Sequence, residues 1–412
     1  MDLVYARCAG LDVHKASVVG CVRVPGTRRG DRHTETRTFA TTLRGLADLA
    51  TWLKSHGVTH VAMESTGVYW RPVYGELERT VQVLLVNARH VQMVPGRKTD
   101  VRDCEWLAQL LECGLLRGSF VPPSAVRDLR DLTRLRKALV RERGHHVNRI
   151  EKTLELANLK LGTVVTDIMG KTGRAILEAL SLGREAPEQL AALAQGSIRA
   201  NKQAALREAV AGRLTPHYAF LLGQHLSLIE ALDTHIETLD ARIETAMAPF
   251  AEAAALVQTM PGVGTRAAQA ILAETGVDMG VFPTAAHFAS WARLCPGLHE
   301  SAGKRRPTTT GQGAVWLRAT LQEVAWAAAR TKRSYYRALY HRLKGRRGAK
   351  KAIVAVQHAM LVALWHMLKY RVPHQDLGAD YFDRRNTARL RHHHVRRLQQ
   401  LGYKVVLVEE AA

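Results

Sequence analysis

Cysteine is scarce and irregularly placed in this chain of 412 residues. The five cysteines, at positions 8, 21, 104, 113 and 295, are odd in number and widely spaced, and no two form a C-x-x-C pair. A disulfide framework needs an even, dense set of cysteines, and a structural zinc site needs closely spaced pairs. The pattern therefore excludes both and predicts reduced thiols in a cytosolic protein.

The sequence also lacks an uninterrupted apolar run long enough to cross a bilayer. Its most apolar stretch, 353–368, is broken by Gln357, His358 and His366, so it predicts a buried helix. The first residues show no basic segment followed by an apolar one, and no signal peptide is expected. We expect no membrane partner.

Acidic residues are few relative to basic ones. The chain has 59 Lys and Arg against 37 Asp and Glu, a formal net charge of +22. Hydrophobic content of 47% is ordinary for a soluble globular protein, and the length allows two or three domains. The excess of positive charge suits a polyanion, most commonly nucleic acid, although a basic surface without a specific partner is the alternative.

Residues 1–122 alternate strand and helix signals. Three strands in hairpin succession are followed by helix, strand, helix and strand, which predicts a mixed α/β sheet; the ribonuclease H-like (RuvC-like) fold is one version. The predicted strands are 8–14, 17–24, 34–40, 58–63 and 81–86, with helices at 42–56 and 69–79.

Residues 123–250 read as all-helical. A long basic helix is predicted over 124–163, with its apolar spacing interrupted at Gly144, and shorter helices follow. Leu222, Ile229, Ile236 and Ile243 recur every seven residues and predict a coiled-coil helix. Its apolar seam could pack within the chain or form a dimerisation interface.

Residues 251–375 form a third predicted region, and 376–412 a basic C-terminal tail ending in a short apolar strand at 404–408. In the third region, Pro261-Gly262-Val263-Gly264 stands between two helices, as in a helix-hairpin-helix. Such a turn presents backbone N–H groups to a phosphate. A plain packing unit of two helices is the alternative.

Basic side chains are densest in this third region. Tyr335, Tyr336 and Tyr340 interleave with them, as expected where a protein tracks a phosphate backbone and stacks on bases. The candidate nucleic-acid-binding residues are Gly262, Gly264, Lys304, Arg305, Arg306, Arg318, Arg333, Arg337, Arg346 and Arg347.

Four carboxylates in separated segments form a candidate metal site: Asp12, Glu64, Asp100 and Asp103. Taken alone, Asp12 is equally consistent with a turn residue, and Asp100 with a helix N-cap. Converging carboxylates can hold two divalent cations for phosphoryl transfer.

Ser301 is a candidate nucleophile. It lies in a glycine-containing loop beside Lys304, Arg305 and Arg306. A serine needs a base or a metal to take its proton and cations to hold the phosphate. An ordinary loop serine is the alternative.

Together these motifs resemble the DEDD-type insertion-sequence transposases, with a RuvC-like amino half and a serine-bearing carboxyl half. The matching segments are 10–15, Met63-Glu64-Ser65-Thr66-Gly67, 98–103, 261–264 and 300–304, so the resemblance spans nearly the whole chain. One departure is Gly311-Gln312-Gly313, where the family usually has a basic residue followed by Gly-Asn. That departure puts a local phosphate contact in doubt.

The resemblance implies a DNA transposase or recombinase of the prokaryotic, nucleoid-associated cytoplasm. Asp12, Glu64, Asp100 and Asp103 would then bind Mg²⁺, and Ser301 would attack DNA. Donor and target DNA, a structured noncoding guide RNA and a homo-oligomer (dimer or tetramer) are the implied partners. The rival hypotheses are a metal-dependent nuclease or junction resolvase that uses water, and a non-catalytic nucleic-acid-binding protein.

Overall fold

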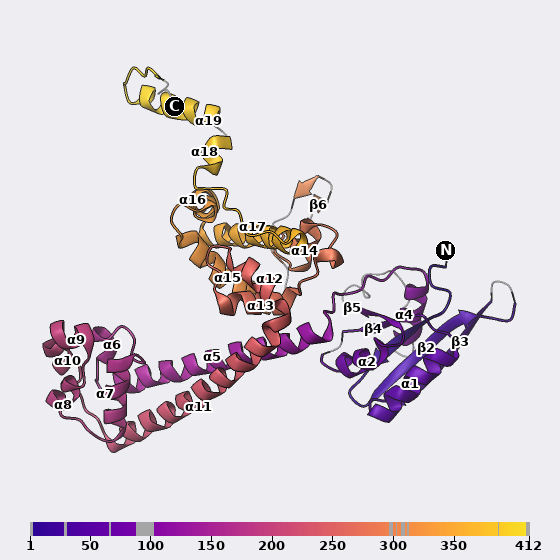
Figure 1. Ribbon diagram of the computed structural model, residues 1–412, viewed down its shortest axis with the longest axis horizontal. Helices are drawn as coiled ribbons and strands as arrows, with labels where there is room; N and C mark the ends of the chain where they lie inside the picture. The colour runs from indigo at the N-terminus through magenta and orange to yellow at the C-terminus, as the bar shows by residue number, and fades with distance from the viewer. Residues whose placement is uncertain are drawn as a thin grey trace. The chain divides into compact units, whose positions relative to one another are not determined.

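The computed structural model describes residues 3–28, 31–65, 67–87, 103–295, 300–301, 303–305, 310, 313–385 and 387–408. Asp100 and Arg306 lie outside these residues, as do the side chains of Ser301 and Arg305. The chain divides into two compact units, Met1–Val121 and Pro122–Ala412 (Figure 1).

The first unit is built on one five-stranded sheet in the order β3-β2-β1-β4-β5. β1, β2 and β3 are antiparallel neighbours, whereas β4 and β5 run parallel to β1. The mixed sheet predicted from the sequence is confirmed, and it agrees with a ribonuclease H-like domain. The strands are β1 (Cys8–Val13), β2 (Ser17–Pro25), β3 (Arg32–Ala40), β4 (His60–Glu64) and β5 (Gln82–Val86).

Helices cover both faces of this sheet. Because side chains alternate along a strand, Leu11 packs on one face with α1 (Leu43–Ser55) and α2 (Trp70–Leu77). Cys8 and Ala62 pack on the other face with α4 (Asp103–Glu112). The strands β1 and β4 are therefore buried on both sides, whereas the edge strand β3 is largely exposed.

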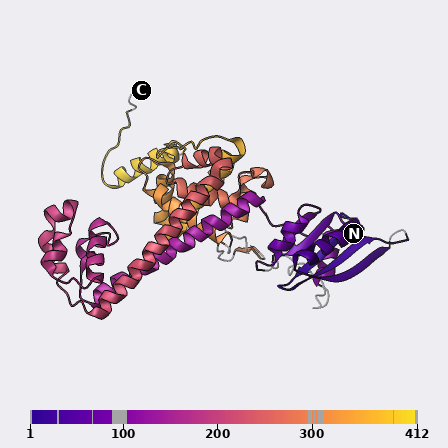
Figure 2. The same ribbon diagram turned by 60° about the horizontal axis from the view of Figure 1, so that its bottom comes forward.

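The second unit begins with two long helices that lie side by side, α5 (Ser124–Leu156) and α11 (Pro216–Met247) (Figure 2). The helix α5 continues through Gly144, where the sequence suggested an interruption. Between them the chain forms five shorter helices: α6 (Leu161–Val164), α7 (Lys171–Ser181), α8 (Pro187–Ala192), α9 (Gly196–Asn201) and α10 (Gln203–Ala209).

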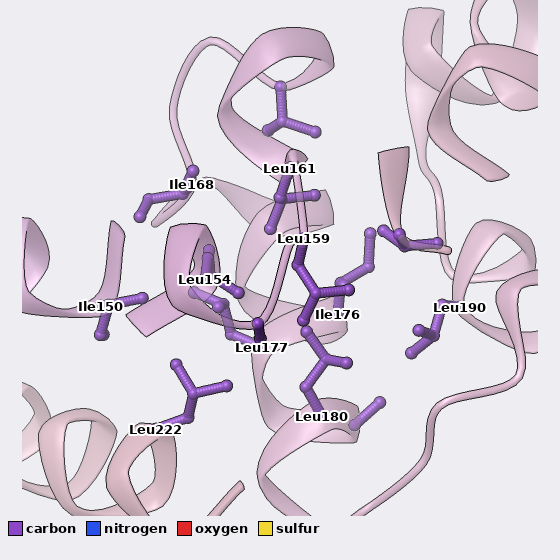
Figure 3. Close-up of a cluster of buried hydrophobic side chains, with 14 of the residues drawn as sticks. Ile150, Leu154, Leu159, Leu161, Ile168, Ile176, Leu177, Leu180, Leu190 and Leu222 are labelled. Carbon is purple, nitrogen blue, oxygen red and sulfur yellow. The ribbon is translucent and has the colours of Figure 1, made fainter. Parts of the chain in front are cut away.

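A hydrophobic cluster joins these shorter helices to the ends of α5 and α11. Ile150, Leu154, Ile176, Leu180 and Leu222 are among its buried members (Figure 3). The four heptad residues of α11 are also buried within this single chain. Since α5 packs along α11, intramolecular packing accounts for the heptads, and a dimer built on them stays a prediction without structural support.

Four of the helices that follow, α12, α14, α15 and α16, pack around α17 (Ala349–Tyr370). By length and composition α17 could cross a membrane, but 56% of its apolar window is buried in the protein, as the predicted buried helix requires. The other elements are η1 (Ala248–Phe250), α12 (Ala251–Gln258), α13 (Thr265–Thr275), η2 (Met279–Val281), α14 (Ala285–Trp291), α15 (Val315–Arg330), α16 (Tyr335–Arg347), α18 (Tyr381–Arg385) and α19 (Thr387–Gln400). Residues 404–408 are not a strand, which corrects the prediction there.

Candidate functional site

Asp12 and Glu64 lie at the same edge of the sheet. β1 and β4 are parallel, with Leu11 paired to Met63, so the next residue of each strand is a carboxylate. Glu64 is the last residue of β4, and Asp12 the penultimate residue of β1. The Asp12 side chain is 31% exposed, and its Oδ2 lies 3.1 Å from Nε2 of His14.

Gly10 brings α4 to this edge. An ideal Cβ on Gly10 would lie 2.1 Å from the carbonyl oxygen of Cys104 and 2.5 Å from the amide nitrogen of Ala108, so only glycine allows the helix this close. Asp12 follows Gly10 by two residues and therefore shares the face that α4 covers.

Asp103 begins α4 and thus reaches the same region. Burial raises the pKa of the Cys104 thiol to about 12, and the charge of Asp12 adds to that increase, which places Asp12 near the first turn of α4. Glu64, two residues after Ala62, shares this face as well. Asp12 and Glu64 therefore lie on one face at one edge of the sheet, and the helix that packs on this face begins at Asp103.

These three carboxylates are not tightly clustered. Within the described part of the chain, the single group of three or more His, Cys, Asp or Glu side chains with all ligand atoms within 4.8 Å is His33, Glu35 and His56, on the other face of the sheet. Two-metal sites for phosphoryl transfer hold their cations about 3.5–4 Å apart. Carboxylate oxygens are also the ligands that Mg²⁺ prefers.

The serine segment forms a small hairpin. β6 (Glu300–Ser301) pairs antiparallel with β7 (Lys304–Arg305), and Ser301 stands directly opposite Lys304. Gly303 takes a left-handed φ of 72° in the connecting turn, a conformation that glycine adopts readily. The backbone register therefore places the candidate nucleophile opposite a cationic residue.

A turn at 261–264, the segment for which a helix-hairpin-helix is predicted, separates α12 from α13, and its two glycines differ. Gly262 has a φ of 83°, and an ideal Cβ there would lie 2.7 Å from the carbonyl oxygen of Val324 on α15. Gly262 is thus required by packing. Gly264 precedes α13 with extended backbone and open space around its Cβ position, and no side chain caps the helix.

The candidate basic residues of the second unit lie mostly at the surface. Arg318 is half-buried and donates from Nη2 to Oγ1 of Thr310 at 3.1 Å. Arg333, Arg337, Arg346 and Arg347 are exposed, as is Lys304. The last turn of α16 therefore carries several cations at its negative dipole end.

The interleaved tyrosines do not form the expected stacking surface. Tyr336 and Tyr340 are only 2% and 7% exposed, so they belong to the core. Tyr335 is half-buried and packs against Tyr381 and Phe382. Their spacing along α16 places them on its inner face, and that face could not be recognised among so many basic residues.

Sequence reasoning missed two buried glutamates that hold the site elements in place. Glu112, at the end of α4, forms ion pairs with Arg23 of β2 and Arg32 of β3. Glu274 of α13 accepts two hydrogen bonds from Arg134 of α5, at 2.7 and 2.8 Å. Neither position carries a sequence signal, because a buried carboxylate resembles a surface one until its partners are known.

A mixed sheet with carboxylates at one edge, followed by a basic helical unit with a serine hairpin, agrees with the class of proteins that process nucleic acid. Residues 9–158 match a DEDD-type family described as transposase, and residues 254–341 match the transposase IS116/IS110/IS902 family. The chain belongs to this IS110-type transposase family. The first match contains all four candidate carboxylates, and the second contains Ser301.

A relative from Sinorhizobium fredii (strain NBRC 101917 / NGR234) carries the name "Putative transposase y4rJ". It is 28% identical over 298 residues, which cover 65% of this chain and 65% of the relative. The alignment therefore spans slightly less than two thirds of that protein.

Proposed function

We propose that this protein is a DNA transposase that cuts and rejoins DNA with a carboxylate-bound Mg²⁺ site and a serine nucleophile. The observation that carries the proposal is the place of Asp12 and Glu64 on the sheet face against which α4, the helix that begins at Asp103, packs closely at Gly10. The order of the two family matches along the chain supports it.

The carboxylates would hold the metal and keep the scissile phosphate in place. Asp12 and Glu64 lie on strands buried on both faces, so their backbone positions are fixed, and Asp103 is fixed by the packing of α4. Asp100 completes the proposed ligand set. Bound Mg²⁺ supplies positive charge that stabilises the leaving oxygen and favours loss of a hydroxyl proton.

Ser301 would supply the attacking oxygen. Its Oγ would form a bond to the phosphorus while the bond to the leaving DNA oxygen breaks. A DNA hydroxyl of the strand to be joined would then attack the same phosphorus, the bond to Oγ would break, and the serine would be regenerated. Lys304, directly opposite in the hairpin, would offset the negative charge on the phosphate. Arg305 and Arg306 would extend that positive surface.

The basic helices would hold DNA and a structured guide RNA. Gly262, Gly264 and Arg318 would contact backbone phosphates, together with Arg333, Arg337, Arg346 and Arg347, in a homo-oligomer in the prokaryotic cytoplasm. The net charge of +22 and the exposure of the arginines on α16 support this role.

The test is strand cleavage by the full-length chain with donor DNA, cognate RNA and Mg²⁺. Asp12→Asn should abolish cleavage, whereas Asp48→Asn, an equal charge change at an exposed position of α1, should not. Ser301→Ala should abolish a covalent protein–DNA adduct, whereas Ser290→Ala on α14 should not.

Each rival hypothesis predicts a different result in this cleavage test. Cleavage by Ser301→Ala without any adduct in the unsubstituted protein would establish a water nucleophile and a nuclease. DNA binding without cleavage in every protein, with cognate RNA present, would establish a binding protein.

A further inference from the structure

A second cluster of possible metal ligands lies in the first unit. It lies away from the sheet edge that carries Asp12 and Glu64 (the carboxylate edge). His33 and Glu35 project from β3, and His56 caps the C-terminal end of α1. Glu35 pairs with Val22 and His33 with Val24 along β2, whereas Asp12 lies opposite Val19. The cluster therefore occupies the other end of the sheet, and on the face that α1 covers.

The imidazole rings of His33 and His56 both lie near the same carboxylate oxygen of Glu35. Nε2 of His56 lies 3.1 Å from Oε2 of Glu35, and Nε2 of His33 lies 3.8 Å from the same atom. The ring planes of the two histidines are 5° apart. The three ligand atoms all lie within 4.8 Å of one another, whereas ligands around a tetrahedral zinc ion stand about 3.3 Å apart, given bond lengths of about 2.0–2.2 Å. To bind one ion, the side chains must move closer and one of the two stacked rings must turn so that both nitrogens face the ion.

The backbone fixes the orientation of His56. Its Nδ1 lies 2.9 Å from the carbonyl oxygen of Trp52, and because a carbonyl only accepts, Nδ1 must carry the hydrogen. In the neutral ring, Nε2 then presents a lone pair to a carboxylate oxygen. Either a second proton or a cation must lie between them, and a metal-binding histidine commonly donates its other N–H to a carbonyl in this way.

We propose that His33, Glu35 and His56 form a binding site for a borderline divalent transition metal such as Zn²⁺, which cross-links the edge strand β3 to the end of α1. Two imidazoles and one carboxylate favour Zn²⁺, Ni²⁺ or Cu²⁺ over Mg²⁺. His33 is 54% exposed, so a solvent ligand can complete the coordination. This site is independent of the proposed transposase chemistry.

Arg37 competes for the same carboxylate. Its Nε lies 2.5 Å from Oε1 of Glu35, the oxygen that the imidazoles leave unused. Arg7 donates to the carbonyl of His56 at 2.6 Å and adds a second nearby cation. Both positive charges oppose a bound metal ion, so removal of Arg37 should strengthen binding.

The experiment is a Zn²⁺ titration of the chelator-treated full-length protein by calorimetry, with excess Mg²⁺ present to occupy the carboxylate edge. Absorption of bound Co²⁺ gives a second readout. We expect one equivalent of Zn²⁺ whose affinity falls roughly 10–100-fold or more in His33→Ala and in Glu35→Gln, and rises in Arg37→Gln.

The histidine-rich tail provides the matched control. Replacing His392, His393 and His394 together with alanine should leave the binding of one equivalent of Zn²⁺ unchanged. The proposal is overturned if the tail variant loses that equivalent, or if His33→Ala and Arg37→Gln both bind Zn²⁺ as the unsubstituted protein does.

Discussion

Gly10 and Cys104 are in contact through backbone alone: a Cβ on Gly10 would lie 2.1 Å from the Cys104 carbonyl oxygen. This contact sets the distance between β1 and α4, and with it the distance between Asp12 and Asp103. The carboxylate edge therefore depends on a residue that has no side chain.

Gly10→Ala should harm both stability and the carboxylate site. The atoms that the new methyl group meets belong to the backbone of α4, so the helix must move, at a cost of about 1–3 kcal/mol or more. Metal-dependent cleavage should fall further than the folded fraction does. Gly75→Ala on α2, where nothing lies within 4 Å of the Cβ position, is the control and should leave both properties intact. Equal behaviour of the two variants in denaturant titration and cleavage assays would refute this dependence.

Glu112→Gln should destabilise the first unit strongly. The Glu112 side chain is only 3% exposed and neutralises Arg23 and Arg32, so its loss leaves two partly buried cations unpaired. Removing one partner of a buried pair typically costs about 3–5 kcal/mol. Glu155→Gln breaks the exposed pair with Lys160 and should cost about 1 kcal/mol or less. Chemical denaturation measures both, and similar losses would contradict the assignment.

The two glycines of the predicted helix-hairpin-helix should separate folding from DNA binding. Gly262→Ala strains a left-handed φ and meets the backbone of α15, so the second unit should lose stability. At Gly264 a new Cβ meets no other atom and the backbone angles suit any residue, so Gly264→Ala should fold normally. If a DNA phosphate binds at the start of α13, the affinity of this variant for DNA should fall. Unchanged DNA affinity in Gly264→Ala would remove this turn from the interface.

The α5–α11 pair should weaken in acid because of His225. Burial lowers the pKa of His225, and His146 and Arg149 lower it further. The unfolded chain, with the usual pKa of 6.5, then binds a proton before the folded chain does. Stability should therefore be complete above about pH 6.5 and decline as the pH falls towards the folded-state pKa.

His225→Asn should remove this part of the acid sensitivity, as measured by thermal unfolding at a series of pH values. His235→Asn, at an exposed position of the same helix, serves as the control. If the two variants have the same pH profile, the decline originates elsewhere.

Much of the fold follows from local patterns. The five strands and the helices near them match their predicted positions closely, because alternating and helical periodicities record which face of each element is buried. The ordered segments 10–15, 63–67, 98–103, 261–264 and 300–304 together point to the family. Periodicity does not identify the partner of a buried face, however, and the heptads of α11 were compatible with packing inside one chain or between two.

Tertiary structure decided what periodicity left open. It placed α5 along the heptads, buried Tyr336 and Tyr340 in the core, and gave Glu112 its two arginines. The sequence by itself determined most of the secondary structure and the order of the chemical groups. Which of those groups meet was decided only by long-range packing, since contacts such as that of Gly10 with Cys104 join residues far apart in the chain.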